Sequence, residues 1–276
     1  MMKYENYVTS GICKKPILAT DQAEGNIVWE ADKGWTKRMG AAAPPNLTGA
    51  TEMVLYNPTE EPCQATLTVY FLEREPHTFE PINVPAERNV GLTMPEWNPT
   101  VFEDVGFWGA RVVSTTPLVA VLSDTLMYYH ENDTFKGGST HFLGTKLNKQ
   151  WHFADGLWLE WKRFHKGDVS KAPFPFNEIE YYYFLNPGPR EAKVDMTLQY
   201  RFIEHTTFHL RVPAERVYVW CNYEKIPYNQ AYGVKVVSTE PISTASTRFI
   251  YGVNGLEEWG LTPHTGMPAE PGPIIE

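Results

Sequence analysis

The chain has 276 residues, of which 42% are hydrophobic and 21% charged, so it is long enough for one large or two ordinary domains with buried cores. A formal charge of -9 with no basic patch argues against a nucleic-acid partner. Cys13, Cys63 and Cys221 form no CxxC motif, so we expect free thiols rather than disulfides or a zinc site. The N-terminus is polar and no apolar run reaches the roughly 20 residues of a membrane helix, which favours a soluble, cytoplasmic protein that does not span a membrane.

Strand-forming segments dominate the chain, and helical periodicity is scarce because 22 Pro and 20 Gly interrupt it. The alternation of apolar and polar residues predicts short strands in both halves of the chain. In chain order we expect them at 52–56, 64–72, 106–114, 118–125, 180–185, 194–203, 207–220, 232–238 and 242–251, with a turn at 115–117. This spacing predicts an all-β protein made of antiparallel β-sandwich units of the jelly-roll kind.

Five short motifs occur twice and in the same order. The residues LYNP at 55–58 return as FLNP at 184–187, and VPAER at 84–88 returns at 212–216. The other pairs are 75–79 with 204–208, 112–117 with 236–241, and the Trp-, Asp- and Gly-containing 29–35 with 151–158. An ordered series of this kind predicts a tandem duplication. We therefore expect a first unit with an N-terminal extension at 1–146, a second unit at 147–253 and an extended C-terminal tail at 254–276.

The repeated motifs resemble those of the Anabaena sensory rhodopsin transducer family, over roughly residues 25–145 and again over 151–252. The family pattern has an Arg near the end of the strand that follows the Ser-Thr-x-Pro motif. Arg248 matches that residue, whereas the first half has Asp124 there. The resemblance implies compact β-sandwiches that self-associate into a homo-oligomer, and its named member is the cytoplasmic partner of a membrane photoreceptor. It favours a binding or interaction module without a cofactor, for a small polar ligand such as a carbohydrate or for a protein partner.

Clusters of acidic and aromatic residues are the first candidates for a ligand site. Asp32 lies near Trp35, and Asp155 lies near Trp158 and Trp161. Carbohydrates are bound by this mixture, because sugar rings stack on aromatic faces while their hydroxyls bond to polar side chains. The alternative is that the Trp rings fill the sandwich cores and each Asp forms a turn before a Gly.

The residues that do not repeat are the second group of candidates. Asp124, Arg248, His130 and His141 are predicted to bind ligand near the junction of the two units, where the segment 137–141 forms a Gly-rich hairpin loop. Asp124, Asp155 and His141 are also the candidates for catalysis, so a carbohydrate-active enzyme of the glycoside hydrolase type, with its acids in the cleft between the units, stays open as the alternative function. A metal site formed by His130, His141 and His152 is a minor alternative.

Overall fold

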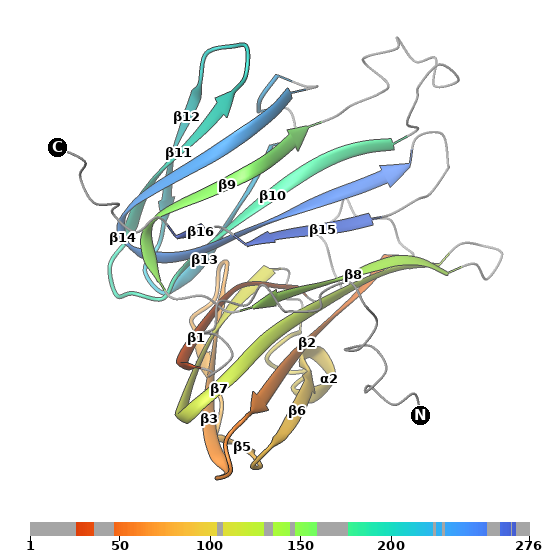
Figure 1. Cartoon of the computed structure of the whole chain (residues 1–276), viewed down its shortest axis with the longest axis vertical. Helices are drawn as coiled ribbons and strands as arrows, with labels where there is room; N and C mark the ends of the chain where they lie inside the picture. The colour runs from red at the N-terminus through yellow and green to blue at the C-terminus, as the bar shows by residue number, and fades with distance from the viewer. Residues whose placement is uncertain are drawn as a thin grey trace.

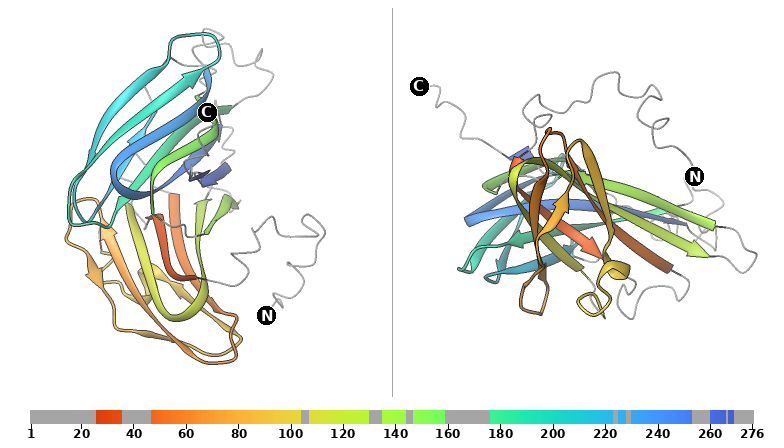
Figure 2. Two further views of the ribbon diagram at one scale, coloured as in Figure 1. Left: turned by 60° about the vertical axis from the view of Figure 1, so that its left-hand side comes forward. Right: turned by 90° about the horizontal axis from the view of Figure 1, so that it is seen from below.

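In the computed structural model of the protein, the described residues are 26–35, 47–103, 107–129, 135–143, 147–158, 176–222, 225–227, 230–252, 260–265 and 267–268. Their regular structure is β-strand except for one four-residue helix, α2 (Met94–Trp97), which confirms the all-β prediction. Each half of the chain forms one eight-stranded antiparallel sheet that curls over, and the two sheets lie one above the other (Figures 1 and 2). Among these residues no helix has the length and apolar character needed to cross a bilayer.

The first sheet folds into two layers around one long strand. Its strands are β1 (Asn26–Trp35), β2 (Leu47–Asn57), β3 (Cys63–Phe71), β4 (His77–Thr78), β5 (Ile82–Val84), β6 (Arg88–Thr93), β7 (Phe107–Tyr129) and β8 (Phe135–Leu143). The first half of β7 pairs with β1 and with β3. Strand β3 also pairs with β4 and β5, and all of these strands form layer A. The second half of β7 pairs with β2 and β8, and together with β6 these form layer B.

The second sheet has the same design. Its strands are β9 (Asn148–Trp158), β10 (Phe176–Asn186), β11 (Ala192–Tyr200), β12 (Thr206–Val212), β13 (Arg216–Cys221), β14 (Gln230–Gly252), β15 (Gly260–Thr265) and β16 (Met267–Pro268). The first half of β14 pairs with β9 and β11, which with β12 and β16 form layer C. The second half of β14 pairs with β10 and β15, which with β13 form layer D. The strands of the two sheets therefore correspond in chain order from β1 with β9 to β8 with β15, with β12 in the place of β4 and β5 together.

Several segments differ from the sequence-based expectations. The predicted strand 207–220 is two strands, β12 and β13, and β14 continues through the predicted gap at 239–241. The residues 115–117 do not separate two strands, because β7 continues through them as it passes from layer A to layer B. The residues 137–141 lie within strand β8 rather than in a loop, and Gly137 pairs with Met127. In the segment expected to be an extended tail, β15 pairs with β14 and β16 with β9, so the second sheet extends to Pro268.

Polar side chains fix equivalent turns in the two halves. The Asn57 side-chain amide donates to the carbonyl oxygens of Glu61, Val84 and Pro85 at 2.7, 3.2 and 3.3 Å. Asn186 repeats all three bonds with residues 190, 212 and 213 at 2.8, 3.1 and 3.0 Å. Both VPAER segments also place their Glu in the left-handed region, with φ of 53° and 54°. The repeated motifs therefore specify turns and their anchors.

Each sheet encloses its own core, and the two sheets also contact one another. Buried residues include Trp108 in the first core and Trp151 in the second, whose indole N–H donates to the Ile242 carbonyl at 3.1 Å. A separate buried cluster joins Tyr70 of layer A to Leu185 and Val217 of layer D. The outer face of layer D thus packs on the first unit.

Candidate functional site

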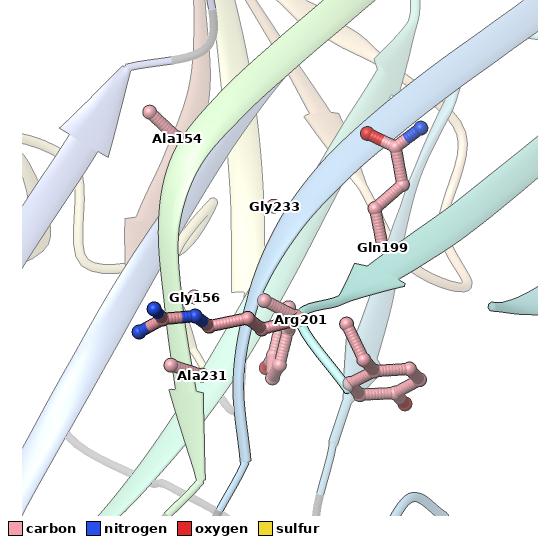
Figure 3. Close-up of a pocket in the computed structure, with 8 residues that line it drawn as sticks. Ala154, Gly156, Gln199, Arg201, Ala231 and Gly233 are labelled. Carbon is pink, nitrogen blue, oxygen red and sulfur yellow. The ribbon is translucent and has the colours of Figure 1, made fainter. Parts of the chain in front are cut away.

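An open pocket of about 240 Å³ lies on the second unit, at one end of layer C (Figure 3). It is formed where β9, β11 and β14 run side by side. Its described lining residues are Ala154, Gly156, Gln199, Tyr200, Arg201, Ala231, Tyr232 and Gly233. Four of the eight are Ala or Gly, so half of the lining carries little or no side chain.

The pocket occupies a place that larger side chains fill in the first unit. Gln199 pairs with Gly233 across the strands, as Tyr70 pairs with Gly109 in layer A. Ala231 likewise stands at the position of Phe107, the first residue of β7. The two aromatic residues are used for docking, because Tyr70 packs on layer D and the Phe107 ring lies 5.5 Å from the Tyr183 ring. Their replacement by Gln and Ala opens the pocket.

A β-bulge shapes one wall of the pocket. The pairing of β9 with β14 shifts between Phe153 and Gly156, and the pairing of β1 with β7 shifts at the matching place, between Ala31 and Gly34. The repeated Ala-Asp-(Lys)-Gly motif therefore marks a bulge in both halves. Gly156 is needed for close packing, because a Cβ there would lie 2.2 Å from Cε2 of Tyr232.

Tyr232 connects the pocket to a polar network buried between layers C and D. Its hydroxyl donates to Glu180 Oε2 at 2.8 Å and accepts from the Asn222 amide at 2.9 Å. Tyr182 donates to the same carboxylate oxygen at 2.8 Å. Arg248 donates to Glu180 Oε1 through Nε and Nη2 at 3.1 and 3.0 Å. Both carboxylate oxygens of the fully buried Glu180 thus have two donors each, and the Tyr232 ring is held in place from behind.

Burial decides the protonation of the groups in this network. Desolvation raises the pKa of Glu180, although the Arg248 charge and the hydrogen bonds from Tyr182 and Tyr232 oppose that rise. Burial and the neighbouring carboxylate raise the pKa of both tyrosines well above the ordinary value. Their hydroxyls therefore stay protonated and act as hydrogen-bond donors to Glu180. The arrangement is suited to fixing side chains in place rather than to exchanging protons with a ligand.

The predicted site residues fall into separate places. In the first sheet, Asp32 and Trp35 are in β1 of layer A. Asp124 is in layer B, where it pairs with Thr51 and Thr140. The neighbouring pair on β7 and β8 is Ser123 with His141. In the second sheet, Asp155 stands between the lining residues Ala154 and Gly156, Trp158 ends β9, and Arg248 belongs to the buried network. His130 and Trp161 lie outside the described residues. The site prediction as a whole stays a prediction.

Of the three histidines of the predicted metal site, His141 and His152 lie in strands of different sheets and His130 lies outside the described residues, so this site stays a prediction. His141 is in β8 of the first sheet, and His152 is in β9 of the second sheet, where its Nε2 lies 3.1 Å from the Gln150 amide nitrogen. Within the described ranges no cluster of three or more His, Cys, Asp or Glu side chains could hold a metal ion.

Sequence reasoning missed Glu180, Tyr182, Asn222 and Tyr232, and the pocket residues Gln199 and Arg201. A signal for the network was present in the repeat. The offset of 129 residues aligns Glu180 with Thr51, and Arg248 replaces Asp124 on the neighbouring strand. An acid and a base that appear together at neighbouring positions of one half indicate a buried ion pair.

No protein-family model matches the chain, and no curated protein matches it. Among solved structures, the crystal structure of Thermotoga maritima 1070 is similar with 18% identity and a TM-score of 0.36, over 45% of this chain and 96% of that one. Anabaena sensory rhodopsin transducer is similar with 20% identity and a TM-score of 0.29, over 35% of this chain and 94% of that one.

Proposed function

We propose that this protein is a noncatalytic binding protein that takes a small polar ligand into the pocket on its second unit. The observation that carries the proposal is the difference between equivalent surfaces. Tyr70 and Phe107 dock a sheet in the first unit, whereas Gln199 and Ala231 leave a pocket at the same place in the second. The paired strands are kept in the second unit, but the two aromatic side chains that contact the other sheet are absent. Such a surface is suited to a ligand smaller than a protein domain.

The lining favours a ligand with several hydroxyl groups. Gln199 offers a side-chain amide and Arg201 offers guanidinium donors, while Ala154 and Ala231 give the lining small apolar surfaces. Carbohydrates combine hydroxyls with apolar ring faces, so sugars are the first class to test. Glu180 supports a binding role rather than hydrolysis, because its oxygens are fully used by Tyr182, Tyr232 and Arg248.

We also propose that the two units arose by tandem duplication, with a boundary near residues 146–147 and a second unit that includes β15 and β16. The same strand order, the matched bonds of Asn57 and Asn186 and the left-handed Glu87 and Glu215 support this history. Duplication accounts for a framework that is kept in both units while single positions, such as Gln199 and Ala231, differ.

The substitution Ala231→Phe tests the proposed site, because it restores the residue that the first unit has at this position. The measurement is a thermal-shift screen with neutral sugars and sugar acids. We expect the sugars that raise the melting temperature of the unchanged protein to lose this effect in the variant. Val237→Phe is the matched control, because it adds the same ring to an exposed position of β14 outside the lining. A sugar-dependent shift that survives Ala231→Phe, or a screen in which no compound raises the melting temperature, would overturn the proposal.

A further inference from the structure

The pocket has one charged side chain among its described lining residues, and that residue is Arg201. The first unit has Leu72 at the equivalent place, directly after the last residue of β3. The same end of the sheet that lost the rings of Tyr70 and Phe107 has therefore also gained a cation. These three differences coincide at one site, on a protein whose formal charge is -9.

Arg201 differs in its partners from the other arginines of the second unit that the structure describes. Arg190, Arg211, Arg216 and Arg248 each form an ion pair with a carboxylate, namely Glu240, Glu191, Glu75 and Glu180. Across the described ranges, no carboxylate pairs with Arg201. An arginine directed to a pocket without a carboxylate partner has its hydrogen-bonding donors available for a ligand.

The Arg201 side chain is held in a defined place. In Figure 3 it extends across β14 toward Gly156 of β9. Its guanidinium carbon lies 4.8 Å from the ring centroid of Phe202, which is 81% exposed. Stacking on a ring occupies the face of a guanidinium and leaves its N–H edge free for a planar, two-pronged acceptor. Carboxylates have that geometry.

We infer that the ligand of this pocket carries a carboxylate, which Arg201 binds through its N–H edge, and that the ligand is a sugar acid of monosaccharide size. The inference rests on the proposed function of the pocket. A volume of about 240 Å³ is below the roughly 300 Å³ at which pockets for drug-sized ligands begin, which fits a single sugar ring. The Gln199 side-chain amide supplies a donor and an acceptor for its hydroxyls.

The test compares acids with their neutral parents on the full-length protein. Titration calorimetry with galacturonate and glucuronate, against galactose and glucose, should show at least one acid bound about tenfold more tightly than its parent sugar, because a charge-assisted pair adds to the shared contacts. Arg201→Gln should remove that advantage, leaving the acid and the parent sugar nearly equal. Arg211→Gln is the matched control, since it makes the same charge change on β12 of the same layer, at a residue paired with Glu191.

The outcomes separate this inference from the function on which it rests. Acids that bind no better than neutral sugars, or an acid preference that Arg201→Gln leaves intact, would overturn the role of Arg201 while the pocket remains a sugar site. Binding that is equally lost in Arg201→Gln and Arg211→Gln would reduce the effect to net charge and overturn the inference as well. If no sugar of either class binds in a way that Ala231→Phe abolishes, the proposed function itself fails.

Discussion

The two units share their framework and differ in their interiors. In the first unit, the positions equivalent to Glu180, Tyr182 and Tyr232 hold Thr51, Met53 and Trp108, so a mainly apolar core takes the place of the network. The framework residues that recur, such as Asn57 and Asn186, lie at turns. This difference teaches that turns fix the path of the chain, whereas the interior behind a surface is free to change with the use of that surface.

The outer surfaces differ in the same direction. Layer A presents Tyr70 and Phe107 to layer D, and layer C presents the pocket at the equivalent place. The polar network stands directly behind that pocket, because Tyr232 belongs to both. The three predictions below test whether the network and the pocket set the second unit apart from the first.

The largest expected effect comes from Glu180→Ala. It leaves Arg248, whose side chain is 11% exposed, without its carboxylate, and removal of one partner from a buried pair costs about 3–5 kcal/mol of unfolding free energy. The equivalent change Thr51→Ala in the first unit should cost only about 1 kcal/mol. Urea denaturation measures both values. The double variant Glu180→Leu/Arg248→Met should recover much of the loss, and equal losses at Glu180 and Thr51 would contradict the contrast between the units.

A smaller loss is expected for Gly156→Ala. The added Cβ would lie 2.2 Å from the Tyr232 ring and 2.9 Å from its carbonyl oxygen, and crowding of this kind costs about 1–3 kcal/mol. Gly233→Ala is the control in the same pocket, because its added Cβ would have no neighbour closer than 3.6 Å. Thermal and urea denaturation should rank the two variants in that order, and a neutral Gly156→Ala would show that the Tyr232 ring is not fixed by the bulge.

The smallest effect concerns alkaline pH. The pKa values of Tyr182 and Tyr232 are raised in the folded state, so their contribution to stability is fully present below the unfolded value of about 10 and is lost as the pH rises above it. Tyr182→Phe and Tyr232→Phe should therefore flatten the fall of the unfolding free energy by about 1 kcal/mol at about pH 11. Tyr56→Phe, at a tyrosine 43% exposed in the first unit, is the control. Parallel curves for all three variants would refute the prediction.

The local parts of the fold could be predicted from the sequence. An Asn-Pro after an apolar strand indicates a turn within a few residues of itself, and both copies of that motif form one. The bend at 115–117 was misread because its residues also favour turns. Ser114 donates to the Thr116 carbonyl at 2.7 Å, and the Thr115 hydroxyl accepts from the Gln64 backbone N–H at 3.0 Å, so the hydroxyls of Ser114 and Thr115 are bonded while the strand continues.

The candidate site could not be predicted in the same way, because it depends on pairings between distant segments. Glu180 meets Arg248 only if β10 and β14 align in one register, and a shift by one residue would place these side chains on opposite faces. The pocket depends on the small volume of the side chains at Gln199 and Ala231. This difference is recognised only when the equivalent residues Tyr70 and Phe107 are aligned with them. The strand at 260–265 could not be predicted from the repeat, because none of the repeated motifs lies in it and its described link to the unit is its pairing with the second half of β14.

The passage of β7 through both layers has a consequence for synthesis on the ribosome. Before β7 emerges, the earlier strands can form only the pairs of β2 with β6 and of β3 with β4 and β5, while β1 has no described partner other than β7. Layer A can therefore close only after the first half of β7 has been made, and layer B only after the second half. The edge of β1 that β7 later covers stays open for about 70–90 residues of translation and that of β3 for about 40–50, the interval in which a nascent chain is most exposed to wrong pairing.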